Sequence, residues 1–124
     1  MAFPQERCRA RYHLEVTNAR ELYREGFLHF ADDRIDEAIA LYLRALEAEP
    51  DLAIAWNGLS MAYRQQGHLD RAIEAGLKLI ELEPDDPLNH TNLSILYQNK
   101  GMIPEAEEEK ALAVQLEMRA QGGG

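Results

Sequence analysis

The chain has 124 residues, which suits a single domain. Its 13 basic and 22 acidic residues give a net charge of −9, which disfavours generic binding to nucleic acid because phosphates would be repelled. One cysteine excludes an internal disulfide and a four-cysteine zinc site. With 46% hydrophobic residues the composition is that of a folded protein rather than a disordered one.

The sequence contains no segment that resembles a membrane span or a secretion signal. Uninterrupted apolar runs such as Leu52–Trp56 are far short of the ~20 residues that a transmembrane helix requires. The first eleven residues lack the apolar core of a signal peptide. We therefore expect a cytoplasmic location without membrane insertion.

Residues 1–18 are predicted to form a flanking segment that includes a helix. Residues 5–16 carry a local balance of +1, whereas the 106 residues after Asn18 hold ten basic and twenty acidic side chains, a balance of −10. Asn18 followed by Glu21 has the spacing of a capping box, which indicates a break before the next helix.

Two hypotheses for this flanking segment stay open. It can be a capping helix that lies on the first repeat through Cys8, Tyr12 and Val16, since the end of a repeat array leaves a face to cover. Alternatively, its arginines make it a basic arm that docks on an acidic neighbour.

The rest of the chain repeats itself every 34 residues. Three columns that keep this step are Ala38, Ala72 and Ala106; Ile35, Leu69 and Ile103; and Leu46, Ile80 and Val114. The repeats span 19–52, 53–86 and 87–120, and residues 121–124 are expected to form a flexible tail.

Each repeat carries two apolar stripes with steps of three and four residues, the period of a helix. In the first two repeats the stripes run over 19–30, 35–46, 52–63 and 69–80. The stripe over 69–80 includes Leu77. Turn residues separate the stripes at 31–34, 66–69 and 100–103, and prolines mark the ends of the second helices at Pro50 and Pro84. The pattern predicts an all-α fold of helix-turn-helix units.

The repeat resembles the tetratricopeptide repeat, whose pattern is W-x2-L-G-x2-Y, then A-x3-F, then P. The middle repeat matches it with Trp56, Leu59, Ser60, Tyr63, Ala72 and Pro84. Departures from it are Glu25, His29, Gly76, His90 and Lys110. The resemblance implies a right-handed α-solenoid of three repeats with an N-terminal flanking helix.

No catalytic or metal-binding pattern is visible. The four histidines, His13, His29, His68 and His90, include no pair four residues apart on a helix, the spacing of a zinc-binding pair. His29 and His90 occupy core-facing repeat columns, so they are interpreted as packing residues. We expect neither an enzyme nor a bound cofactor or metal.

By resemblance to the family, five positions of each repeat face a concave groove that binds other proteins. The first repeat places there Arg20, Tyr23, Phe27, Phe30 and Ala31; the second Ile54, Asn57, Met61, Arg64 and Gln65; the third Leu88, Thr91, Ile95, Gln98 and Asn99. The positions of the family's carboxylate clamp are Tyr23, Phe27, Gly58, Leu88 and Asn92, without a cation. Binding of the C-terminal tails of heat-shock chaperones is therefore disfavoured.

Three hypotheses for function remain. The first is a non-catalytic adaptor or assembly factor that binds a helical or extended protein segment in an apolar groove. The second is a self-associating scaffold subunit whose groove or end repeat is filled by another protomer, a reading favoured by the absence of a helix that covers the third repeat. The third is a small acidic secretion-type chaperone, for which the chain is short.

Overall fold

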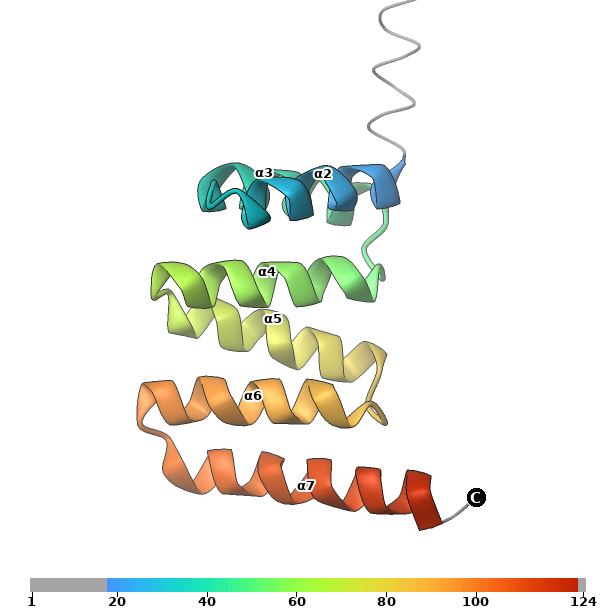
Figure 1. Cartoon of the computed structure of the whole chain (residues 1–124), viewed down its shortest axis with the longest axis vertical. Coiled ribbons are helices and arrows are strands. Elements are labelled where there is room, and N and C mark those ends of the chain that lie inside the picture. Colours follow the sequence, from blue (N-terminus) through green and yellow to red (C-terminus); the bar gives the residue numbers. More distant parts are fainter. Residues whose placement is uncertain (1–17, 123–124) are drawn as a thin grey trace, which may run out of the picture.

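The computed structural model describes residues 18–122. Within this range the chain forms six helices and no strand, arranged as three antiparallel hairpins stacked on one another (Figure 1). In chain order they are α2 (Ala19–Ala31), α3 (Ile35–Ala48), α4 (Ala53–Gln66), α5 (Leu69–Leu82), α6 (Pro87–Lys100) and α7 (Ile103–Gly122). The predicted all-α solenoid is confirmed. The flanking helix that the sequence predicts before Asn18 lies outside the described residues.

The start of α2 is fixed by a side-chain cap. Oδ1 of Asn18 accepts the backbone N–H of Glu21 at 3.2 Å, as the sequence predicts. The carboxylate of Glu21 does not complete a capping box, because it accepts from Arg24 at 2.6 Å instead. The helix therefore has half of the predicted box.

The three tight turns within the hairpins use the same repeat position in a left-handed conformation. This position is Asp33 in the first hairpin, with φ of 64°, and Gly67 and Gly101 in the others, with φ of 83° and 85°. Glycine adopts this conformation without the steric cost that a side chain brings. The first repeat thus has a less favourable residue at a turn that the other two make with glycine.

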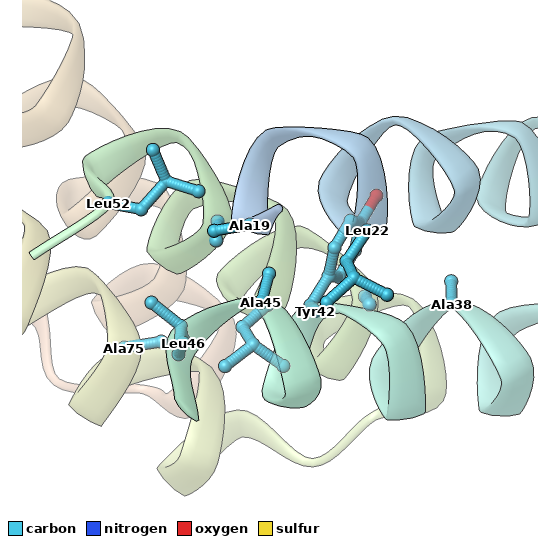
Figure 2. Packing of buried hydrophobic residues seen from close by; sticks show 11 residues of the cluster. Ala19, Leu22, Ala38, Tyr42, Ala45, Leu46, Leu52 and Ala75 are labelled. Atoms are coloured by element: carbon cyan, nitrogen blue, oxygen red, sulfur yellow. The ribbon is translucent and has the colours of Figure 1, made fainter. Parts of the chain in front are cut away.

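The core of the first two repeats is built around Tyr42, whose side chain is fully buried (Figure 2). Small residues surround it. A Cβ atom on Gly26 would lie 2.7 Å from the Tyr42 ring, and one on Gly58 would lie 2.8 Å from it, so both positions must lack a side chain. The ring of Tyr42 thus joins α3 to both α2 and α4.

A second cluster joins α5 to α6 through the buried Ala72, Ile73, Leu93 and Leu96. In this half of the molecule, serine takes the place that Gly26 has in the first repeat. Ser60 Oγ donates to the carbonyl of Ala72 at 3.0 Å, and Ser94 Oγ donates to that of Ala106 at 2.8 Å. Each bond ties the two helices of one hairpin together.

Two details of the structure differ from what the sequence pattern indicates. The helix α7 includes Gln121 and Gly122, so it runs past the predicted start of the tail, because no glycine or proline stops it between Glu105 and Gln121. Leu77 lies in a predicted apolar stripe but is exposed, because the buried face of α5 is centred on Ala72, Ala75, Gly76 and Leu79.

The connections between helices lie at two opposite edges of the stack. The α3–α4 and α5–α6 connections lie at the edge where α2 begins and α7 ends (Figure 1). The tight turns that contain Asp33, Gly67 and Gly101 lie at the other edge. Every first helix of a hairpin therefore points in the same direction.

Candidate functional site

The fifteen predicted groove residues lie on the first helices of the hairpins, α2, α4 and α6. Contacts between α2 and α4 bring two of these helices directly together. Since the helices share one direction, equivalent repeat positions lie in rows across this face. Two hollows lie on this face.

The first, which we call the aromatic hollow, lies between α2 and α4 and has a volume of about 80 Å³. It is lined by Tyr23, Phe27, Phe30, Tyr42, Asn57, Gly58 and Met61. The ring of Tyr23 stacks on that of Phe27 at 6.3 Å between centroids and on that of Tyr42 at 5.5 Å. Phe27 and Met61 are 51% and 48% exposed, so two of the large apolar side chains that line the hollow are accessible to a partner.

The polar atoms of this hollow carry no charge near neutral pH. Burial raises the pKa of Tyr23, and burial together with the charge of Tyr23 raises the pKa of Tyr42 to about 12. Both hydroxyls therefore stay protonated. The surface offered to a ligand here is apolar and aromatic, with neutral hydrogen-bonding groups.

The second, the acid-rimmed hollow, lies between α4 and α6 and has a volume of about 330 Å³. It is lined by Ala53, Ile54, Asn57, Leu79, Glu83, Asp86, Leu88, Asn89 and Asn92. Asn57 lines both hollows, so the two adjoin at this residue of α4. We call the two hollows together the groove.

The side chains of the acid-rimmed hollow are held by local hydrogen bonds. Asp86 caps α6 by accepting the backbone N–H of Leu88 at 3.0 Å, and Asn89 Nδ2 donates to the carbonyl of Glu83 at 3.0 Å. Leu88 is nevertheless 64% exposed and Ile54 41% exposed. The hollow thus combines open aliphatic side chains with carboxylates and amides.

The structure brings seven of the fifteen predicted groove residues to the two hollows. Tyr23, Phe27, Phe30, Asn57 and Met61 line the aromatic hollow, and Ile54, Asn57 and Leu88 line the acid-rimmed one. The other eight line neither hollow and lie on the same helices around them: Arg20, Ala31, Arg64, Gln65, Thr91, Ile95, Gln98 and Asn99.

Several lining residues were not predicted. Tyr42 comes from α3, a second helix, and reaches the aromatic hollow because Gly58 leaves room for its ring. Glu83 and Asp86 come from the α5–α6 connection. The sequence does contain a signal for the position of Tyr42. Only the first repeat combines a glycine, Gly26, with an aromatic residue at the position of Tyr42, whereas the other two repeats have serine in place of the glycine and lack the aromatic ring.

A third hollow, of about 490 Å³, lies outside this groove. It is lined by Leu43, Trp56, Leu59, Tyr63, Arg71, Glu74, Ala75, Leu77, Lys78 and Glu81. Leu43 and Leu77 occupy one repeat column, and both are exposed. Its rim mixes both signs of charge, so it offers less distinct complementarity than the groove.

His90 is a buried packing residue, as its repeat column predicts. Nδ1 of His90 lies 2.7 Å from Oε1 of Glu109, and Nε2 lies 2.8 Å from the carbonyl oxygen of Pro84. Burial by itself lowers the pKa of His90, but the hydrogen bonds to Glu109 and Pro84 and the charges of Glu109 and Asp85 outweigh it, so the pKa is raised. The residue joins α6 to α7 and lines neither hollow of the groove.

Between residues 18 and 122 no three histidine, cysteine or acidic side chains gather closely enough to hold a metal ion. In the same range no helix has the length and apolar character needed to cross a membrane.

Two family models described as tetratricopeptide repeat match the chain, one over residues 23–87 and one over residues 75–108. The chain belongs to the tetratricopeptide repeat family. Members of this family are generally non-catalytic interaction modules. No curated protein matches the sequence at a significant level.

Solved structures share the fold. A crystal structure of MamA is 28% identical, with a TM-score of 0.84 over 86% of this chain and 63% of that one. A second MamA structure is 29% identical, with a TM-score of 0.80 over 86% of this chain and 58% of that one. The chain thus spans about three-fifths of the MamA chains that it matches.

The first tetratricopeptide repeat domain of Spaghetti (RPAP3), bound to the HSP90 peptide SRMEEVD, is more distant. It is 19% identical, with a TM-score of 0.76 over 80% of this chain and 79% of that one. At this identity the similarity shows the fold alone.

Proposed function

We propose that this protein is a non-catalytic interaction module, an adaptor or assembly factor, that binds a helical or extended segment of another protein in the groove. The observation that carries the proposal is the aromatic hollow with Phe27 and Met61 half exposed beside it. Large apolar side chains that stay open around a hollow are typical of a surface that a partner covers. The single cysteine fits a reducing compartment such as the cytoplasm, which we propose as its location.

The chemistry of the groove favours a segment with a bulky apolar anchor. Aromatic rings and the adaptable thioether of Met61 suit such an anchor, and the amides of Asn57 and Asn92 can pair with an extended backbone. The carboxylates of Glu83 and Asp86 repel a negatively charged peptide. A partner that ends in an acidic tail, such as a heat-shock chaperone, is therefore not proposed.

The proposal is tested by comparative capture from a lysate of the source organism. The wild type is compared with Phe27→Glu/Met61→Glu, and with Leu28→Glu/Leu112→Glu as a matched control. Like Phe27 and Met61, Leu28 and Leu112 are exposed apolar residues, but they line neither hollow of the groove. Capture by the wild type and the control, but not by the groove variant, supports the proposal; equal capture by all three contradicts it.

A second candidate function is a self-associating scaffold, and the outer side of α7 favours it. Val114 shares a repeat column with Leu46, which is buried, and Ile80, which is half-buried, yet Val114 is 49% exposed. Light scattering at a series of protein concentrations distinguishes the two functions, because a protein that is monomeric at every concentration excludes the scaffold hypothesis.

A further inference from the structure

Two apolar residues that line the acid-rimmed hollow are not covered by any other described part of the chain. Leu88 and Ile54 expose 64% and 41% of their surface there, and Glu83 and Asp86 stand beside them. None of the ion pairs between described residues involves either carboxylate. An occupant of this hollow must therefore bring both apolar and positively charged groups.

The negative charge extends along the edge of the stack at which this hollow lies. The carboxylates around the α3–α4 and α5–α6 connections are Glu47, Glu49, Asp51, Glu81, Glu83, Asp85 and Asp86. No lysine or arginine occurs in residues 45–63 or 79–99. The C-terminal ends of α3 and α5 lie at this edge and have no basic residue in the last turn.

A segment with the complementary chemistry begins at the same edge. Residues 1–17 lead into Asn18, and α2 starts at the edge of the stack that carries the two acidic connections (Figure 1). They contain three arginines in alternate positions, Arg7, Arg9 and Arg11, and apolar side chains on both sides of them, Phe3, Tyr12 and Leu14. With Glu6 and Glu15 the segment carries a balance of +1, whereas the 106 residues after Asn18 carry a balance of −10.

The reach of this segment is sufficient. From Asn18 to Arg11 the chain has seven residue steps, and to Arg7 eleven, which span up to roughly 24 Å and 37 Å when extended. Helices that pack together lie about 8–10 Å apart, and α6 packs on α5 while α2 contacts α4, so a path from α2 past α4 to α6 is at most roughly 30 Å, within the extended span to Arg7.

We propose that residues 1–17 bind in the acid-rimmed hollow of their own chain. The guanidinium groups of Arg7, Arg9 and Arg11 pair with the carboxylates of the rim, and the neighbouring apolar side chains cover Leu88 and Ile54. The segment then occupies one half of the groove and leaves the aromatic hollow open. This inference needs no external partner, so it can fail while the proposed function stands.

The chain supplies a pair of probes for the test. Cys8 is its one cysteine and lies between Arg7 and Arg9, and Trp56 is its one tryptophan. Trp56 is held on α4 by a hydrogen bond of 2.8 Å from its Nε1 to the carbonyl of Pro50, at the acidic edge. A dye on Cys8 that accepts energy from tryptophan reports the distance between the segment and α4 in the full chain.

We expect efficient transfer at ~0.1 M salt and a loss of about half or more at ~1 M, because the Debye length falls from about 10 Å to about 3 Å. Glu49→Gln/Glu83→Gln/Asp85→Asn should lower transfer at ~0.1 M salt in the same way. The matched control Glu105→Gln/Glu107→Gln/Glu108→Gln removes equal charge from the start of α7, at the other edge, and should leave transfer unchanged.

Two further variants test the two halves of the contact. Arg7→Gln/Arg9→Gln/Arg11→Gln should lower energy transfer as Glu49→Gln/Glu83→Gln/Asp85→Asn does. Ile54→Gln/Leu88→Gln should lower it too, and both side chains are exposed enough to replace without loss of the fold, which circular dichroism verifies. Asp86 is left intact because it caps α6.

Each other outcome overturns the proposal. Transfer that is insensitive to salt and to the charge variants means that the segment packs as an apolar cap on the first repeat or stays apart from the hollow. A response to charge but not to Ile54→Gln/Leu88→Gln removes the hollow as the site. Transfer that rises with protein concentration means that the segment fills the groove of a second copy.

Discussion

Nδ1 of His90 on α6 lies 2.7 Å from Oε1 of Glu109 on α7. Nε2 of the same ring reaches the carbonyl of Pro84 at 2.8 Å, the bond that Trp56 makes to Pro50 one repeat earlier. A carbonyl and a carboxylate are both acceptors, so the ring must be protonated at both nitrogens to donate to both. The histidine thus replaces the tryptophan of the repeat and adds an ion pair between helices.

This pair should make stability depend on pH in a defined direction. The pKa of His90 is higher in the folded chain than in the unfolded one, so its contribution is complete below pH ~6.5 and is lost as pH rises through the raised pKa. We expect Glu109→Gln to lower the free energy of unfolding by about 1–2 kcal/mol below pH ~6.5, and by less at higher pH.

Urea unfolding at a series of pH values compares the wild type with Glu109→Gln, and the NMR signal of the His90 ring gives its pKa directly. Two equal pH profiles, or a pKa of His90 below its ordinary value, would show that the ion pair does not hold α7 in place.

Replacement of Gly58 and of Gly76 by alanine should change the stability of the fold in opposite directions. Gly58→Ala places a methyl group 2.8 Å from the fixed ring of Tyr42, and overpacking of this kind costs about 1–3 kcal/mol. A Cβ on Gly76 meets Leu93 at 3.5 Å, an ordinary contact, so Gly76→Ala should gain about 0.5–1 kcal/mol from helix propensity. Thermal unfolding of the two variants checks both signs, and a stabilising Gly58→Ala would falsify the placement of Tyr42.

Replacement of Asp33 by glycine should stabilise the turn between α2 and α3. Its φ of 64° lies in the left-handed region, and the equivalent residues are Gly67 and Gly101. We expect Asp33→Gly to raise the free energy of unfolding by about 0.5–1 kcal/mol, because a side chain in this conformation costs about 1–2 kcal/mol and aspartate is among the residues that tolerate it best. Asp32→Gly, one residue earlier with a negative φ, is the control and should not stabilise the chain.

Alanine substitutions at two nearby positions of α4 should affect stability differently, because one side chain is in the core and the other lies at the groove. Leu59 is fully buried, so Leu59→Ala should cost about 2–5 kcal/mol of stability. Met61 is 48% exposed beside the aromatic hollow, so Met61→Ala should change stability by at most about 0.5 kcal/mol. Denaturant unfolding measures both, and a large loss for Met61→Ala would mean that the side chain is part of the core and not open to a partner.

The sequence by itself determined the repeat, the class of fold and the turns. A period of 34 residues, with apolar steps of three and four inside it, is a local property of the chain, and it recurs as helices that start at Ile35, Leu69 and Ile103. Periodicity was less reliable at the margins of a stripe, where Leu77 is exposed, and at the end of α7, which lacks a stop signal before Gly122.

Only the tertiary structure decided how the face of the first helices is divided. Seven predicted residues line its two hollows, while Tyr42 and Glu83 enter from a second helix and a connection. These depend on distances between helices far apart in sequence, such as the room that Gly58 leaves for the Tyr42 ring. A repeat pattern states which positions share a face, but the volumes of facing side chains determine where that face is open.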